Sequence, residues 1–501
     1  MPERSEVPEG WEYANLGTVA ELISGSGFPL EYQEKTGQKY PFYKVGNLGE
    51  VKSGQYLTES KHTISEDTAS ELRAKIIPKD SIVFAKIGMA IALNRRRLIG
   101  VPSCIDNNMM AAVPNTSILS QYLLRFLETI DFMQYSQATT VPSLRRTDLA
   151  EIKVPLPPLA EQHRIVAAIE ALFARLDAAN ARLERVPGIL KQFRQAVLAA
   201  ACDGRLTEDW RKEHPGAEDA SRLLYQIRNT HELGGKGHGG KAAPPTDGIH
   251  LLDQSNFPEP WTVSSLNWLC MPGRPITYGI LKPGPDQVNG IPYIRVADFP
   301  NDKILVEGVR RTTKEIADNY KRSALIGGDV LLSIRGTVGR VCRVPSELEG
   351  ANVTQDTARI SVHELLYADY VEIYLRCPSV KKILDRCTKG VAIRGVNIGD
   401  VRALQVAIPP LPEQHEIVRR VDALFALADR IEAEVAAARA KTGTMRQSIL
   451  AQAFSGRLVP TEAELARREG RVYEPASVLL ERIRSGERAK KAGKESQSTL
   501  T

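Results

Sequence analysis

The 501-residue chain lacks the features that mark secreted proteins, membrane proteins and zinc-binding domains. None of its six cysteines stands in a CxxC pair, so the sequence suggests neither a zinc site nor a disulfide framework. The N-terminal MPERSEVPEGWEY has no apolar signal core, and no apolar run is long enough to span a bilayer. We therefore expect a cytoplasmic protein with reduced thiols and no membrane contact.

Catalytic motifs are also missing. The run GGKGHGGKA has the spacing of a phosphate-binding loop, but Ala242 stands where Ser or Thr would bind magnesium, and no strand precedes it. Glu151-Ile152-Lys153 has the E-x-K spacing of a nuclease, but Asp148 is too close in sequence to complete such a site. We expect a non-catalytic chain that holds no metal ion and no cofactor of its own.

Composition leaves the partner open. Hydrophobic residues make up 43% and charged residues 25% of the chain, which is typical of a globular protein with room for two to four domains. The net charge of +6 is compatible with nucleic-acid binding but does not argue for it.

The most informative feature is a repeat. PPLAEQHRIVAAIEALFARLDAANARL starts at Pro157 and PPLPEQHEIVRRVDALFALADRIEAEV at Pro409, and 22 of the 50 positions from Pro157 to Leu206 are identical in the second copy. The copies end on RQAVLAAACDGRL and RQSILAQAFSGRL. An ungapped internal repeat indicates that one structural unit is used twice.

Apolar residues recur in both copies at alternating spacings of four and three. The predicted seam residues are Ile165, Ile169, Leu172, Leu176, Ala179, Leu183, Val186, Leu190, Phe193 and Val197, and Ile417, Val421, Leu424, Ala428, Ile431, Val435, Ala438, Thr442, Met445 and Ile449. Such a seam is typical of a coiled coil, and two helices of matched length in one chain favour an antiparallel pair. The alternative is an ordinary amphipathic helix packed on its own globular domain.

The segment before each helix has the pattern of a compact α+β domain. In the first we expect strands within Tyr40–Gly49 and Ile76–Gly88, and a helix over Ile118–Ser136. The same order returns in the second, at Ile291–Phe299, Leu325–Arg340 and Leu365–Cys377. The two domains share order but little identity, whereas the helices after them have stayed alike.

We therefore predict an α+β, pseudo-two-fold protein: two similar globular domains separated by two long helices that form an antiparallel coiled coil. The predicted boundaries are 1–156 for the first domain, 157–228 for the first helical spacer, 229–256 for a Gly/Pro-rich linker, 257–408 for the second domain, 409–485 for the second spacer and 486–501 for a disordered tail.

Two variable domains, each followed by PPL-x-EQ-H and then a helix ending in GRL, resemble the specificity subunit of Type I restriction–modification systems. The resemblance covers essentially the whole chain. It implies that the domains are target recognition domains, that the helices are conserved spacers, and that the chain reads a bipartite site in double-stranded DNA. It also implies docking to two methyltransferase (M) subunits and up to two restriction (R) motor-nuclease subunits, which would carry S-adenosylmethionine, ATP and Mg²⁺.

Helix length fits this interpretation. A helix over Ala160–Val186 would span roughly 40 Å at about 1.5 Å per residue. One turn of DNA is about 34 to 36 Å. The helices could therefore hold two readers about one turn apart.

Candidate site residues fall into two groups. Arginines and lysines near turns and strand ends are candidates for DNA contact: Lys86, Arg95, Arg96, Arg97, Arg145 and Arg146 in the first domain, and Arg335, Arg340, Arg343, Lys389 and Arg394 in the second. The repeated motif and seam supply the candidates for coiled-coil pairing and subunit docking: Glu161, Gln162, His163, Ile165, Ile169, Leu172 and Leu176, and Glu413, Gln414, His415, Ile417, Val421 and Leu424. Tyr43 and Tyr293 fit packing better than base stacking.

Two other functions stay open at this point. One is a self-sufficient DNA methyltransferase or nuclease, which the missing motifs disfavour. The other is a coiled-coil scaffold that binds no DNA, which would not need two diverged domains on uniform helices.

Overall fold

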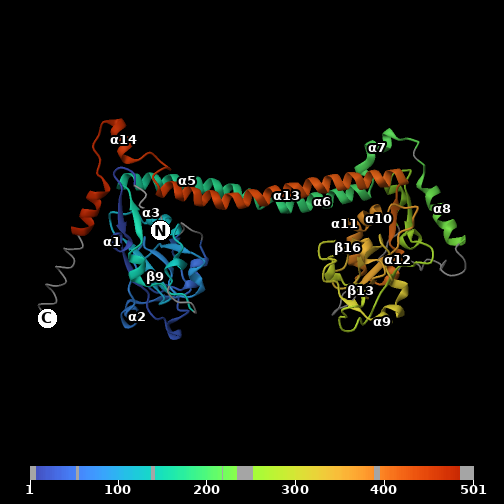
Figure 1. Cartoon of the computed structure of the whole chain (residues 1–501), viewed down its shortest axis with the longest axis horizontal. Helices are drawn as coiled ribbons and strands as arrows, with labels where there is room; N and C mark the ends of the chain where they lie inside the picture. The colour runs from blue at the N-terminus through green and yellow to red at the C-terminus, as the bar shows by residue number, and fades with distance from the viewer. Residues whose placement is uncertain are drawn as a thin grey trace. The chain divides into compact units, whose positions relative to one another are not determined.

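The computed structural model describes residues 7–51, 56–136, 141–216, 218–233, 252–388 and 395–485 (Figure 1). The chain divides into two compact units, one formed by Met1–Leu183 with Ala437–Thr501 and the other by Glu184–Ala436. Each unit contains one mixed α and β domain and one helix pair, and both repeat copies contribute to each pair. The predicted α+β class with two similar domains and paired long helices is confirmed.

The first domain, residues 12–156, is built on a five-stranded sheet of order β2-β9-β6-β7-β4 and a three-stranded sheet of order β5-β3-β8. The strands are β2 (Ala20–Ser24), β3 (Tyr40–Tyr43), β4 (Tyr56–Leu57), β5 (Thr63–Ile64), β6 (Ile82–Ala85), β7 (Arg96–Ile99), β8 (Cys104–Ile105) and β9 (Met109–Pro114). Neighbours are antiparallel except for the β4–β7 and β3–β8 pairs.

The second domain, residues 262–408, repeats this plan with a four-stranded sheet, β12-β18-β15-β16, and a three-stranded sheet, β14-β13-β17. Its strands are β12 (Thr277–Tyr278), β13 (Ile291–Ile294), β14 (Arg311–Thr312), β15 (Val330–Ser333), β16 (Val341–Arg343), β17 (Asn352–Val353) and β18 (Thr357–Ile360). The β13–β17 pair is parallel, as β3–β8 is in the first domain.

The central strand β6 shows why the first domain folds as two layers around one sheet. Ile82 and Phe84 belong to the core that contains Trp11, while Val83 and Ala85 belong to the core that contains Tyr43. Because successive side chains of a strand point to opposite faces, a continuous apolar run is buried on both sides. Tyr43 and Tyr293 are buried, as predicted.

The first and last strands of each domain pair with each other. β1 (Glu12–Asn15) runs antiparallel to β10 (Lys153–Leu156), and β11 (Thr262–Ser265) to β19 (Gln405–Ile408). In both cases a Pro-Pro pair follows the last strand, and the long helix begins immediately after it. Both ends of each domain therefore lie together at the start of a helix.

Shorter helices complete each domain. They are α1 (Leu16–Val19), α2 (Glu66–Glu71), α3 (Ser120–Glu128) and α4 (Arg146–Ala150) in the first, and α9 (Lys314–Asn319), α10 (Ala368–Leu375), α11 (Pro378–Cys387) and α12 (Ile398–Ala403) in the second. The helix predicted over Ile118–Ser136 is shorter, because the Asp131 side chain accepts a hydrogen bond from Met133 N and starts a separate 3-10 turn. The strand expected over Tyr40–Gly49 likewise ends at Tyr43.

The long helices pair within each unit, where Figure 1 shows them side by side. α5 (Leu159–Leu183) packs against the C-terminal part of α13 (Leu411–Phe454), and α6 (Val186–Cys202) against its N-terminal part. The first repeat copy is thus two helices, whereas the second is one. Pro187 explains the break, because a proline cannot donate to the carbonyl of Leu183 and its ring clashes there, while Arg439 occupies the equivalent position in α13.

The seam prediction holds best near the ends of the helices. Ile165, Ile169, Ile417 and Val421 are buried, and Leu172 and Leu424 are half-buried. The prediction is wrong at Ala179 and Met445, which are exposed, Met445 by 43%. At the latter site the Arg446 guanidinium lies 4.4 Å from the Phe173 ring centroid, so a cation–π contact replaces the expected apolar one.

After each helix, a short segment returns to the domain of its unit. In the first unit these are α14 (Glu462–Glu469) and a helical stretch at 476–485; in the second they are α7 (Glu208–Glu213) and α8 (Ala220–Leu233). Ala476 N donates to Gly10 O and Ala220 N to Pro260 O. α8 covers the first residues of the predicted linker, most of which lies outside the described residues, as does the predicted tail from 486.

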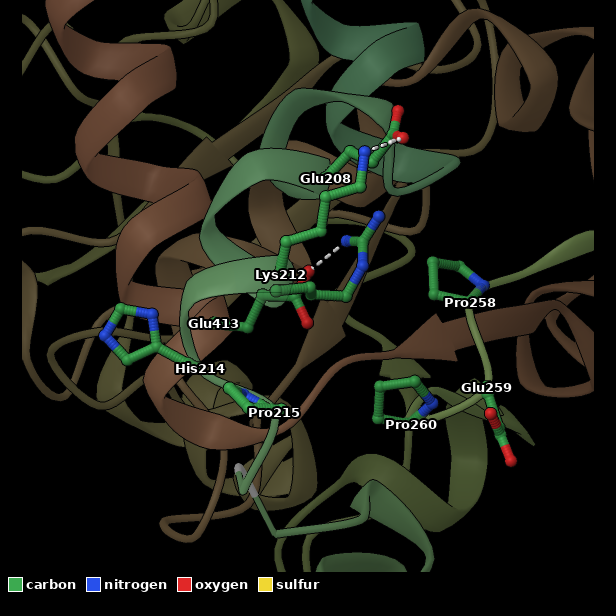
Figure 2. Close-up of a pocket in the computed structure, with 9 residues that line it drawn as sticks. Glu208, Lys212, His214, Pro215, Pro258, Glu259, Pro260 and Glu413 are labelled. Carbon is green, nitrogen blue, oxygen red and sulfur yellow. Dashed lines mark hydrogen bonds and ion pairs between the residues drawn. The ribbon is translucent and has the colours of Figure 1, made fainter.

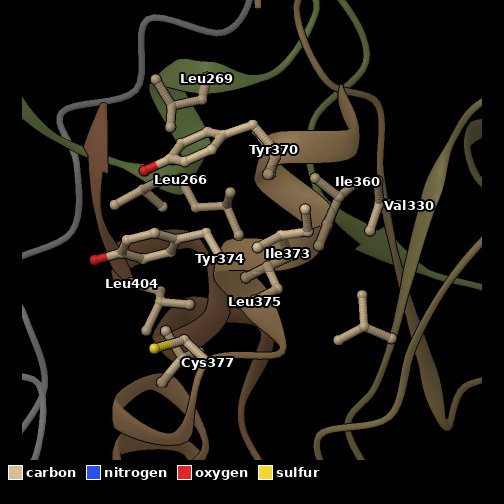
Figure 3. Close-up of a cluster of buried hydrophobic side chains, with 14 of the residues drawn as sticks. Leu266, Leu269, Val330, Ile360, Tyr370, Ile373, Tyr374, Leu375, Cys377 and Leu404 are labelled. Carbon is tan, nitrogen blue, oxygen red and sulfur yellow. The ribbon is translucent and has the colours of Figure 1, made fainter. Parts of the chain in front are cut away.

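Each unit has its own large apolar core. In the second, Tyr370, Tyr374 and Cys377 pack with Leu266 and Leu404 (Figure 3). Residues of the returning helix α8, Leu224 and Ile227, join the same cluster. Burial of a large apolar side chain contributes about 1.5–3 kcal/mol, so these segments contribute substantially to the fold.

Candidate nucleic-acid interface

The repeated EQ dipeptide holds the start of each long helix on its domain, an arrangement that we call the clamp. In the first unit Trp11 Nε1 donates to Glu161 Oε1 at 2.9 Å, and Glu462 N donates to Glu161 Oε2 at 2.8 Å. Gln162 accepts from Leu119 N at 2.9 Å and donates to Pro157 O at 3.1 Å. Both side chains are fully buried, so they fix the helix to its own domain.

The second clamp repeats the first with one added charge. Glu413 accepts from Trp261 Nε1 at 2.9 Å and from Thr207 Oγ1 at 2.7 Å, and it forms an ion pair with Arg211. Figure 2 shows Glu413 in the pocket that Lys212 and Pro258 also line. Gln414 accepts from Tyr367 N at 2.9 Å. In both units the helix start belongs to one repeat copy, and the Thr-Glu segment that closes the clamp follows the other copy.

Burial and charge act differently in the two clamps. Desolvation raises the pKa of Glu161, and the hydrogen bonds from Glu462 N and Trp11 only partly oppose it. In the same unit, Arg164 and Arg471 outweigh the burial of Glu462 and lower its pKa. In the first clamp, Arg164 and Arg471 therefore form ion pairs with Glu462 and not with Glu161. In the second clamp, Arg211 forms its ion pair with Glu413 itself.

The third residue of the motif has the opposite orientation. His163 and His415 are exposed, next to the buried glutamate and glutamine. The His415 ring lies 4.1 Å from the Tyr367 ring. Of the motif residues predicted to dock partners, only the histidines are therefore accessible, since Glu161, Gln162, Glu413 and Gln414 are used internally.

A matched ion pair joins the helices in each unit. Arg446 bonds Asp177 in the first unit, and Arg194 bonds Asp429 at 2.6 Å in the second. The arginine comes from the RQ segment of one copy and the aspartate from the middle of the other, which is the register of an antiparallel pair. Arg194 has a second partner, Glu432, at 3.0 Å.

In the first domain, three loops meet beside the turn between β8 and β9. Lys86 N donates to Asn108 O at 2.7 Å, and Leu144 N donates to Lys86 O at 3.0 Å. Ser26 N donates to Ile105 O at 3.0 Å. A Cβ at Gly25 would overlap the carbonyl oxygen of Asp106, so the close approach requires glycine.

The second domain builds the same junction beside the turn between β17 and β18. Ile334 N donates to Asp356 O, and Val396 N to Ile334 O, both at 2.8 Å. Ile280 N donates to Val353 O at 2.7 Å, and a Cβ at Gly279 would overlap that oxygen. The junction is thus set by the backbone and shared by both domains.

The predicted DNA contacts of the first domain divide between the surface and the interior. Lys86, Arg145 and Arg146 belong to the loop junction or follow it, with Lys86 half-buried and the two arginines exposed. Arg95 is exposed on the segment before β7. Arg96 and Arg97 are only 1% and 8% exposed.

The structure corrects the expectation for Arg96 and Arg97. Arg96 donates to Ile130 O and lies over the Phe132 ring, and burial lowers its pKa to about 10. Arg97 donates to Val51 O and Arg96 O. Both guanidinium groups satisfy backbone carbonyls inside the domain and are not available as DNA contacts.

In the second domain Arg335 lies at the loop junction, where its NH1 donates to Gln355 Oε1 at 2.9 Å. Arg340 is half-buried and reaches Val296 O at 3.3 Å, while Arg343 forms an ion pair with Asp369. Lys389 and Arg394 lie outside the described residues.

Four residues of these sites were not predicted from the sequence. Asn107 and Gln355 lie at equivalent places in the two turns, and Trp11 and Trp261 lie in the clamps. The similarity of GWEY and PWTV could have identified the tryptophans.

The described residues form neither a metal cluster nor a membrane-spanning helix, and the E-x-K residues have structural partners. Within the described ranges, no group of three or more His, Cys, Asp or Glu side chains could hold a metal ion. Glu151 and Lys153, the E-x-K candidates, both bond the Asn15 side chain. In the same part of the chain, no helix combines the length and apolar character needed to cross a bilayer.

Comparison with solved structures shows that the fold is shared. The chain resembles the HsdS subunit from Thermoanaerobacter tengcongensis with a TM-score of 0.56 and 19% identity, over 91% of this chain and all of that one. A chain from work on the assembly and conformational transition of the type I R-M system gives a TM-score of 0.59, also at 19% identity, over 90% of this chain and 100% of that one.

Sequence comparison goes further. A family model described as the Type I restriction modification DNA specificity domain matches residues 8–187 and again residues 258–437. The specificity subunit of the Type I restriction enzyme EcoBI from Escherichia coli is 36% identical over 72% of this chain and 69% of its own length. That of EcoKI, from strain K12, is 26% identical over 98% of both chains. Since each family match covers one domain and the first part of the repeat copy that follows it, the chain belongs to the DNA specificity subunits of Type I restriction–modification systems.

Proposed function

We propose that each domain reads one half of a bipartite site in double-stranded DNA, and that the chain itself catalyses no reaction. One observation carries this proposal: both domains place the same loop junction on the same sheet plan, yet the side chains at the junction differ. A protein that reads two different half-sites requires a constant frame and variable readers. A scaffold without DNA contacts would gain nothing from the difference, and an enzyme would need reactive groups at the junction.

The proposed DNA surface of the first domain contains Lys86, Arg95, Arg145 and Arg146, and that of the second contains Arg335 and Arg340. Arg343 is a weaker candidate because Asp369 already neutralises it. Lys389 and Arg394 stay predictions from the sequence. Cations of this kind bind phosphates and can also read guanine.

We further propose that the helix pairs carry the M subunits, with His163 and His415 on the docking face. Two M subunits and up to two R subunits complete the assembly, and they hold S-adenosylmethionine, ATP and Mg²⁺. On this basis the domain boundaries at 156, 228, 256, 408 and 485, and the cytoplasmic location, remain as predicted from the sequence.

The test is a chain with two copies of one reader. Residues 12–156 are replaced by residues 262–408, with the junctions at the paired end strands, and the chain is expressed with its M subunits. Methylated adenines are then mapped by single-molecule sequencing. We expect two identical half-sites in inverted orientation and an unchanged gap. Methylation at the parent site, or loss of all sequence preference in a folded complex, would contradict independent reading.

The helix pairs are proposed to set the gap between half-sites. Residues 174–180 and 443–449 flank the Asp177–Arg446 ion pair on facing helices, so deleting both keeps the heptad register. The deletion removes about 10 Å of helix, which corresponds to roughly three base pairs. We expect the preferred gap to shorten by that amount, and an unchanged gap would refute this role.

A further inference from the structure

Two pairs of positions occupy the same place in the two domains but carry different chemistry. Ile87 forms an isolated antiparallel bridge with Ser143, and Arg335 forms one with Gly395. Each is followed by a glycine with positive φ, Gly88 at 82° and Gly336 at 70°. Ile87 and Arg335 are therefore structurally equivalent.

The same holds for Asn107 and Gln355 in the adjacent turns. The residue after each accepts from the neighbouring loop, Asn108 O from Lys86 N and Asp356 O from Ile334 N. The residue before each is tied to the three-stranded sheet, Asp106 N to Tyr43 O and Thr354 N to Ile294 O. The frame thus presents two side-chain positions, filled by Ile87 and Asn107 in one domain and by Arg335 and Gln355 in the other.

In the second domain the two side chains act as one group. Arginine has donors only, so the oxygen of Gln355 must face it, and the 2.9 Å bond fixes the amide with its NH₂ group away from Arg335. Among the described residues, neither the Gln355 amide nitrogen nor the other guanidinium nitrogens form a further hydrogen bond. The pair therefore presents mainly hydrogen-bond donors, because the oxygen of Gln355 is turned toward Arg335.

The first domain offers a different surface at this place. Asn107 is exposed and carries both a donor and an acceptor, and Ile87 is apolar and half-buried. In the major groove, guanine shows two acceptors, adenine an acceptor and a donor, and thymine a methyl group. A surface that consists mainly of donors matches guanine, whereas an amide beside an apolar side chain matches an A·T pair.

We propose that these two pairs determine specificity: Arg335 with Gln355 selects a G·C pair in the half-site of the second domain, and Ile87 with Asn107 selects an A·T pair in that of the first. This inference rests on the proposed function, since it assumes that the loop junction faces DNA. A cation that bound only the phosphates common to both half-sites would be expected in both domains. However, the first domain has Ile87 at the position equivalent to Arg335.

The test exchanges the pairs and leaves the rest of each domain in place. The chain carrying Ile87→Arg and Asn107→Gln, and the chain carrying Arg335→Ile and Gln355→Asn, are each assembled with M subunits. Each complex selects DNA from a duplex library with randomised half-sites. We expect one base pair of the first half-site to change from A·T to G·C in the former and one of the second to lose G·C in the latter, by roughly ten- to a hundred-fold. The other half-site should not change.

Two controls separate the possible failures. Arg335→Lys keeps the charge but not the planar donor fork, so we expect it to reduce the preference for guanine and leave binding to the non-cognate library nearly constant. The chain with a duplicated domain enters the same selection. If it selects identical half-sites while the exchanged pairs select the parent sequence, this inference fails and independent reading stands. If the exchanged pairs weaken binding to all sequences equally, they are backbone contacts and the inference is overturned.

Discussion

The two clamps make the clearest comparison within the molecule. Glu161 in the first unit and Glu413 in the second each accept a hydrogen bond from a buried tryptophan and a second from the segment that follows the other repeat copy. Only Glu413 also has an arginine on its carboxylate. The clamps thus share their side-chain contacts. The loop junctions share their backbone hydrogen bonds but differ in their side chains.

This difference separates what the fold requires from what it leaves free. A buried carboxylate must have its partners, because an unpaired one is costly, so the clamp recurs in nearly the same form. A loop residue such as Asn107 or Arg335 has no such constraint. The two units therefore share the buried hydrogen bonds of the clamp and differ in the side chains of the loop junction.

The largest expected effect compares the clamps directly. Glu413→Ala leaves the half-buried Arg211 without its carboxylate partner and strands the donors of Trp261 and Thr207, so it should destabilise the second unit by about 3 kcal/mol, the lower end of the range for a broken buried ion pair. Glu161→Ala leaves only the uncharged donors Trp11 Nε1 and Glu462 N without an acceptor, so we expect a loss of stability of about 1–3 kcal/mol in the first unit. Hydrogen exchange followed by mass spectrometry resolves the two units, and Glu434→Ala, an exposed position on α13, serves as the control. Equal losses would show that Arg211 adds nothing to the clamp.

A second prediction concerns the aromatic end of α13. Phe454 packs edge-on against Tyr122 and Phe126, with ring centroids 5.3 and 5.4 Å apart, whereas the equivalent Cys202 packs in the core with Tyr370 and Cys377. Phe454→Cys should therefore cost about 2 kcal/mol through the cavity that it leaves. Cys202→Phe should cost about 1–3 kcal/mol by overpacking. Chemical denaturation of each variant gives the values, and a stabilised variant of either kind would contradict this account of the packing.

The ion pairs between helices should contribute least to stability. Both aspartates are exposed to solvent, so Asp177→Ala and Asp429→Ala should each cost about 0.2–1 kcal/mol. The loss at Asp429 should be the smaller, because Arg194 keeps Glu432 as a partner. Double-mutant cycles with Arg446 and Arg194 measure the two couplings, and a larger coupling at Asp429 would reverse the ranking.

The two repeat copies carry opposite charges at one equivalent position, Arg164 in the first and Glu416 in the second. The contribution of Glu416 to stability can be tested by its dependence on pH. The hydrogen bond from Arg419, with help from Arg420, lowers the pKa of Glu416 from 4.5 to about 2. Its stabilising contribution is therefore present above about pH 4.5 and is lost as the pH falls toward 2. Glu416→Gln should be less stable than the parent near neutral pH, and the difference in urea midpoint should shrink on acidification. A difference that is constant with pH would exclude the ionic contribution.

Local patterns predicted much of this architecture. The seam located the long helices, because Ile165, Ile169 and Val421 follow a period that depends on the helix alone. The sequence also contains the cause of the break between α5 and α6, Pro187, although the predicted seam continues past this residue. Arg96 shows the limit: its burial depends on Phe132 and Ile130, which approach it only in the folded domain.

The partners of the EQ dipeptide could not be predicted for the same reason. Glu161 was predicted to dock a partner because its helix neighbours are polar, whereas its actual partner, Trp11, is far away in sequence. Asn107 and Gln355 gave no signal, since only the packing of several short strands places them beside Ile87 and Arg335. Periodic elements could be predicted, and contacts between distant segments could not.

The paired end strands have a consequence for how such a protein changes over generations. Because β1 joins β10 and β11 joins β19, each domain is an insertion whose two ends meet at one place in the frame. A single recombination event that replaces the DNA between those strands would give a new reader to an unchanged helix pair. The target of the protein can therefore change in one step.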